Sequence, residues 1–201
     1  MAAPAFDYLD SMAWDIALSA VLVGLAALRL PYKASSDSVE DGNKKLRTGF
    51  AAAIGGSGLY LFLTGISISF KWSFASSGGI YNILFGGIAT LGGLTLVVAA
   101  IALFLNGGLS VVSYFAAVVA LYAVIDAYAM MNYGLTSNPT LAALAYLSFA
   151  AAGFLAVPAT HINSKYARWI FAIFAFLFAI AWGYQGYQFT TGHLKPPAPA
   201  S

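Results

Sequence analysis

The chain has 201 residues, of which 61% are hydrophobic and only 8% are charged. A soluble domain carries about 25% charged residues, so this composition predicts an integral membrane protein and leaves no room for a soluble domain. The net charge is +2 and the basic residues form no stripe, which argues against nucleic acid as a partner. The absence of cysteine excludes disulfides, thiolate metal sites and a cysteine nucleophile.

Six apolar stretches are long enough to cross a bilayer, which needs about 20 residues of helix. We therefore predict an all-α polytopic membrane protein, a single transmembrane helical domain over residues 1–201 with about six spans. The segment before the first span carries two aspartates and no lysine or arginine, so it does not resemble a signal peptide. The predicted spans are residues 13–30, 48–70, 80–105, 109–132, 140–160 and 169–189.

The charged segment Lys33–Arg47, between the first two spans, mixes both signs and is expected to be a solvated linker. The second span then opens with the run GFAAAIGGSG, whose small residues recur every four positions. Such spacing allows the backbone of a second helix to approach closely. The predicted contact pairs are Ala51/Gly55, Ala52/Gly56 and Ala53/Ser57.

Seven of the nine lysines and arginines fall on one side of the predicted spans. They lie at the connections between spans one and two and between spans five and six. The positive-inside rule places that side in the cytoplasm, so both termini are expected outside, in a multi-pass protein of the plasma membrane.

Polar residues inside the spans gather near the predicted outer end, whereas the inner halves are built from small and aliphatic residues. Asp126 is the most telling, because an ionised carboxylate inside a span costs roughly 2.5–3.5 kcal/mol at the membrane centre. We predict an outer-facing polar vestibule above a packed apolar plug. Its candidate residues are Asp15, Asn82, Asp126, Tyr128, Asn132, Tyr184, Gln185 and Gln188.

Other interpretations of these polar residues stay open. They can contact lipid headgroups or join two helices by hydrogen bonds. A proton relay through Asp126 would need further carboxylates or histidines at mid-depth. His161 and His193 fall at opposite ends of the predicted bundle, about 30 Å apart, which disfavours a shared haem or zinc ion. The sequence therefore predicts no catalytic residue, no metal site and no cofactor other than a bound lipid or quinone.

Four segments resemble a family of small prokaryotic integral membrane proteins from archaea and actinobacteria, catalogued as a domain of unknown function. The resemblance implies a multi-span helical protein and no particular activity. Relatives carry an acidic residue after the FG pair of the second segment, where this chain has Gly87. The segments are TGISISFKW (Thr64–Trp72), GGIYNILFGG (Gly78–Gly87), YGLTSNP (Tyr133–Pro139) and GYQ-x-x-x-GHL (Gly186–Leu194).

Three functions follow as expectations. The first is a non-catalytic subunit of a larger membrane assembly, such as a respiratory complex, with lipids and other membrane subunits as partners. The second is a channel or transporter for small solutes or ions that uses the outer vestibule. The third is a membrane enzyme or binding protein for lipid or quinone, although no catalytic set is identified for it.

Overall fold

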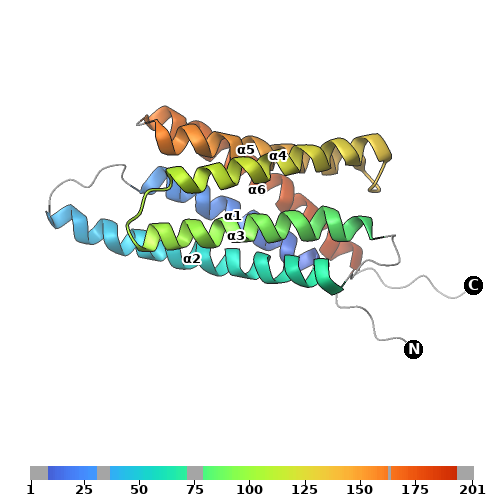
Figure 1. The fold of residues 1–201 in the computed structure, drawn as a ribbon, viewed down its shortest axis with the longest axis horizontal. Helices are drawn as coiled ribbons and strands as arrows, with labels where there is room; N and C mark the ends of the chain where they lie inside the picture. Colours follow the sequence, from blue (N-terminus) through green and yellow to red (C-terminus); the bar gives the residue numbers. More distant parts are fainter. Residues whose placement is uncertain (1–8, 31–36, 72–78, 163, 194–201) are drawn as a thin grey trace, which may run out of the picture.

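The structure is a computed structural model that describes residues 9–30, 37–71, 79–162 and 164–193. Within these residues the chain is all-helical, with six helices that are each long and apolar enough to cross a membrane (Figure 1). The predicted class, a multi-pass helical membrane protein, is confirmed. The helices are α1 (Leu9–Arg29), α2 (Asp37–Lys71), α3 (Ile88–Phe104), α4 (Ser110–Tyr133), α5 (Pro139–His161) and α6 (Lys165–His193), with a π-helix η2 (Asn82–Gly87) leading directly into α3.

The six helices form a closed ring in chain order. Each helix packs against the next one, and α6 returns to pack against α1. The most extensive contacts join α2 with α3, α4 with α5, and α1 with α6, whereas α3 and α4 contact each other least among neighbours. Because directions alternate, the start of α1 and the end of α6 lie at one end of the bundle (Figure 1). We call this the terminal end, and the opposite end, which holds Arg29 and Ser110, the connection end.

Glycines allow the three best-packed pairs to approach closely. A Cβ on Gly93 of α3 would lie 2.4 Å from the backbone nitrogen of Phe62 on α2. Between α4 and α5, a Cβ on Gly153 would lie 2.8 Å from the carbonyl oxygen of Ala116. Between α1 and α6, a Cβ on Gly24 would meet the ring of Phe176 at 3.0 Å. Small residues therefore set the distances between helices, as expected when burial from water does not drive their association.

The predicted small-residue pairs on α2 are only partly right. Ala51 is buried, and a Cβ on Gly55 would lie 3.1 Å from Ala100 of α3, so this pair does face a neighbouring helix. Ala52 and Gly56 are exposed on the outside of the ring. The reason is geometric: successive residues are rotated by about 100° in a helix, so overlapping pairs cannot all face one partner.

Helix α2 begins at Asp37, within the segment that was expected to be a solvated linker. The prediction that this segment is a loop is wrong for residues 37–47, which are helical. Residues 33–36 lie outside the described ranges. The first residues of α2, DSVEDGNKKLR, place acidic residues four positions before lysines. This spacing stabilises helices in water. Helix α6 likewise begins at Lys165 and extends to His193, beyond the predicted span at both ends.

Candidate functional site

The ring encloses a cavity of about 690 Å³, and every one of the six helices contributes to its wall. The lining starts at the connection end, with Leu30, Arg47 and Arg168, and continues to Tyr146 and Trp182. Arg168 and Trp182 are 14 positions apart on α6, which corresponds to about 21 Å of helix. The cavity therefore follows the bundle axis over roughly two thirds of the ~30 Å hydrocarbon core of a membrane.

Small residues that face inwards leave room for the cavity between the larger side chains that also line it. Ala20, Ala89 and Ala152 are buried and line the space, and a Cβ on Gly92 would meet no atom within 4 Å. By contrast, aliphatic and aromatic side chains such as Ile101 are more than half exposed on the outside of the ring. In a membrane this arrangement costs little, since lipid tails cover the outward side chains as well as a core would.

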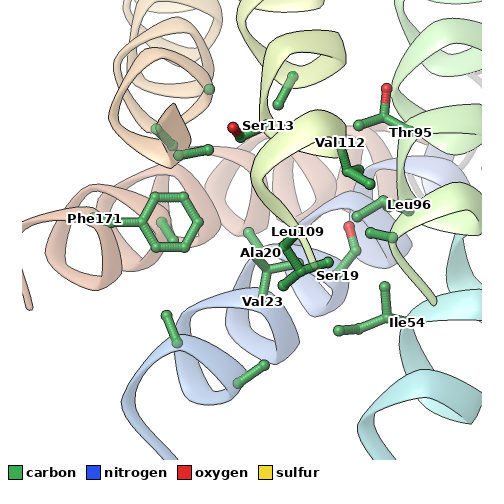
Figure 2. A pocket seen from close by; sticks show the side chains of 18 of the residues that line it. Ser19, Ala20, Val23, Ile54, Thr95, Leu96, Leu109, Val112, Ser113 and Phe171 are labelled. Carbon is green, nitrogen blue, oxygen red and sulfur yellow. The ribbon is translucent and has the colours of Figure 1, made fainter. Parts of the chain in front are cut away.

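The wall is apolar even where it carries hydroxyl groups. Figure 2 shows side chains of α1, α2, α3, α4 and α6 around the space, with Ser19, Thr95 and Ser113 among them. Ser19 donates to the carbonyl oxygen of Ile16 at 2.9 Å, Thr95 to that of Leu91 at 2.8 Å, and Ser113 to that of Ser110 at 2.7 Å. Each hydroxyl proton is thus donated to a backbone carbonyl three or four residues earlier in the chain, as is common for serine and threonine in helices.

Two arginines line the cavity at the connection end. The guanidinium of Arg47, on α2, donates a hydrogen bond to Oδ1 of Asn106 in the turn between α3 and α4. The guanidinium of Arg168, on α6, donates to the carbonyl oxygen of Leu30 at the end of α1. Each guanidinium has five N–H donors, so donors remain for another partner. No carboxylate occurs among the described residues that line the cavity, so this end is positively charged.

Aromatic residues close the cavity towards the terminal end. Tyr146 is 2% exposed, and its ring centroid lies 5.7 Å from that of Trp182. Phe178 contacts Trp182 edge to face at 6.3 Å, and Phe149 contacts Phe178 at 5.1 Å. Among the described residues, Nε1 of Trp182 has no hydrogen-bond acceptor, although this side chain lines the cavity. The Trp182 ring therefore forms part of the floor, while its Nε1 is itself buried.

Behind this floor, buried polar groups surround the π-helix. Asp126 of α4 is 5% exposed, and its Oδ2 has no hydrogen-bond partner among the described residues. It interacts electrostatically with Tyr122 and Tyr146. Tyr122 reaches the π-helix, because a Cβ on Gly87 would lie 2.7 Å from its hydroxyl oxygen. Asn82, the first residue of the π-helix, is 1% exposed. Such helices are rare and are frequent at functional sites.

The eight residues predicted to form an outer vestibule separate into two groups. Asp126 and Asn82 are buried inside the ring, and Asp15 is half-buried and accepts a hydrogen bond of 2.9 Å from Ser57. Gln185 is also half-buried. The exposed group consists of Tyr128, Asn132, Tyr184 and Gln188.

The cavity lies at the end opposite to the predicted vestibule, and none of the eight residues lines it. The half that was expected to be a packed apolar plug is hollow, whereas the terminal end is densely packed, with Met12 and Met130 at 0% exposure. Tyr128 lies outside because it follows Asp126 by two positions, about 200° around the helix. The sequence analysis did not single out Arg47 or Arg168 as site residues, although their positions at the start of the second and sixth spans were evident.

A metal site is not evident in the described part of the chain, where no three histidine, cysteine, aspartate or glutamate side chains gather around a common point. His161, at the connection end, lies against Tyr114, with ring centroids 5.1 Å apart and ring planes tilted by 57°. The wall of the cavity is largely apolar, and its charged side chains, Arg47 and Arg168, lie at the connection end.

Comparison with known proteins gives a family and no activity. A family model described as a protein of unknown function, DUF981, matches residues 1–196. No curated protein and no solved structure matches the chain. The match covers nearly the whole sequence and agrees with the resemblance to a membrane family of unknown function. The chain belongs to the DUF981 family.

Proposed function

We propose that this protein binds a lipid-like molecule, a lipid or a quinone, within its ring of helices. The observation that carries the proposal is the cavity of about 690 Å³ with an apolar wall. This volume lies in the range of about 300–1,000 Å³ that is typical of ligand sites. The ends of the cavity differ chemically, with two arginines at one end and the aromatic rings of Tyr146 and Trp182 at the other.

The size of the cavity argues that it holds a molecule in the membrane. Protein interiors are close-packed and leave few voids larger than a water molecule, whereas this partly open space measures about 690 Å³. A chain with larger inward-facing side chains would fill it. The alanine and glycine lining therefore favours a bound molecule over a packing defect.

The two other expectations from the sequence are less well supported. A channel needs a path along the whole axis, and the buried aromatic residues Tyr146, Phe178 and Trp182 interrupt it. A subunit role within a larger assembly is compatible with ligand binding. However, the exposed apolar faces of the helices suit lipid and partner helices equally, so they do not favour that role.

Filling the cavity tests the proposal. Gly92 lines the cavity and Gly56 faces outwards, and a Cβ on either glycine meets no atom within 4 Å. We expect Gly92→Phe to occupy the site and Gly56→Phe to leave it unchanged. Each variant is purified from native-type membranes, and its bound lipids and quinones are extracted and quantified by mass spectrometry.

The wild type and Gly56→Phe should retain the same molecule at about one equivalent, and Gly92→Phe should lose most of it. Equal retention by Gly92→Phe and Gly56→Phe would show that the molecule binds on the outer surface. That result would refute the proposal, as would a wild-type preparation that carries only the bulk lipids of the membrane.

A further inference from the structure

The two arginines at the connection end suggest what kind of molecule the cavity takes. Arg47 and Arg168 are half-buried and line the cavity from two different helices, α2 and α6. Their hydrogen-bond acceptors, Asn106 Oδ1 and the Leu30 carbonyl, are both neutral. Among the side chains that the structure describes, neither arginine forms an ion pair. Two uncompensated cations therefore face one apolar space.

Charge beside an apolar space is costly unless it is paired. A partly buried cation loses hydration, and an opposite charge with hydrogen-bonding oxygens offsets that loss. Guanidinium groups match carboxylates and phosphates especially well, because their N–H donors form a fork that suits two oxygens. The described residues that line the cavity supply no such anion, so a ligand is the natural source of one.

The depth of the cavity indicates what the apolar part of the ligand must be. Below the arginines the wall is apolar for about 21 Å, down to the aromatic floor at Trp182. A molecule with its charged group at the arginines would extend a single hydrophobic chain into this space. The arginines lie in terminal parts of their spans, where a headgroup can meet the membrane–water interface.

We infer that the cavity takes a single-chain anionic amphiphile, with its carboxylate or phosphate group bound between Arg47 and Arg168 and its chain directed towards Trp182. This inference rests on the proposed function and narrows it to one class of ligand. A neutral quinone would leave both arginines without a counter-charge. A two-chain phospholipid would need space for its second chain.

Binding of three probes with the same chain tests the inference. Palmitate, hexadecyl phosphate and hexadecanol differ in their polar groups alone. Dissociation constants are measured with the full chain in nanodiscs of phosphatidylcholine. For the wild type we expect the anionic probes to bind at least about tenfold more tightly than hexadecanol. The tighter of the two anions identifies the headgroup as a carboxylate or a phosphate.

The double variant Arg47→Gln/Arg168→Gln keeps side chains that can donate hydrogen bonds and removes both charges. It should bind palmitate and hexadecyl phosphate no better than hexadecanol, with hexadecanol affinity unchanged as evidence of an intact cavity. The matched control is Arg29→Gln, because Arg29 lies at the same end but is exposed and does not line the cavity. It should behave like the wild type.

The outcomes separate the two proposals. Equal binding of hexadecanol and both anions by the wild type would overturn the inference about charge and leave the binding function standing. An equal loss of anion preference in the double variant and in Arg29→Gln would likewise overturn the inference about charge and leave the binding function standing. Failure of all three probes to bind the wild type would overturn the inference and, together with a lipid-free preparation, the proposed function as well.

Discussion

The hydroxyl of Tyr146 on α5 donates a hydrogen bond of 2.8 Å to the carbonyl oxygen of Leu84, inside the π-helix that opens the third span. The same tyrosine ring contacts Trp182 on the floor of the cavity, with ring centroids 5.7 Å apart. The buried side chain of Tyr146 thus connects the π-helix to the floor of the cavity. The changed hydrogen-bond pattern of a π-helix can leave a carbonyl able to accept from a neighbouring helix.

Removing that hydroxyl should destabilise the bundle. Tyr146→Phe keeps the ring packed against Trp182 but leaves the Leu84 carbonyl without this donor in a buried position. A buried acceptor left unsatisfied costs about 1–3 kcal/mol. We expect Tm in detergent to fall by several degrees, measured by intrinsic fluorescence. Tyr128→Phe is the matched control, because Tyr128 is 67% exposed, and its Tm should stay within a degree of the wild type.

Asp15 and Asp126 should respond differently to the same substitution. Asp126→Asn removes a buried carboxyl whose Oδ2 has no partner, so thermal stability at neutral pH should be unchanged or raised. Asp15→Asn weakens the hydrogen bond that Ser57 donates to the carboxylate at 2.9 Å, so stability should fall. Both variants are compared with the wild type by thermal unfolding. A loss of stability in Asp126→Asn as large as in Asp15→Asn would contradict the absence of a hydrogen-bond partner for the buried Oδ2 of Asp126 among the described residues.

A single methyl group should distinguish the packed face of a helix from its outer face. In Gly93→Ala the new Cβ would lie 2.4 Å from the backbone nitrogen of Phe62, so α2 and α3 must separate. We expect a loss of a few kcal/mol, in line with overpacking elsewhere. In Gly56→Ala the Cβ meets no atom within 4 Å, and the gain in helix propensity should stabilise the protein by about 0.5–1 kcal/mol. Denaturation in mixed micelles measures both, and equal effects would refute the close contact of α2 and α3.

The sequence predicted the class of this protein because hydrophobic length is a local property. Each span carries enough consecutive apolar residues to cross a membrane, whatever its neighbours are. The ends of the helices were less predictable. The start of α2 at Asp37 follows the charge spacing of its first residues, whereas the π-helix at Asn82 packs against α2 and is reached by Tyr122 and Tyr146, contacts that only the fold creates.

The position of the cavity could not be predicted, because these helices are apolar on nearly all sides. A helix in a soluble protein shows its inner face by an apolar stripe, and a membrane helix that lipid surrounds need not. Which of Asp126 and Tyr128 points inwards is decided by how six helices pack together, and both are equally near the end of α4 in the sequence. The amino-acid sequence alone determined that the described chain has six helices long and apolar enough to cross a membrane. Only the tertiary structure decided that small residues from all six face one space, with Arg47 and Arg168 at its open end, because closing the ring fixes the rotation of every helix at once.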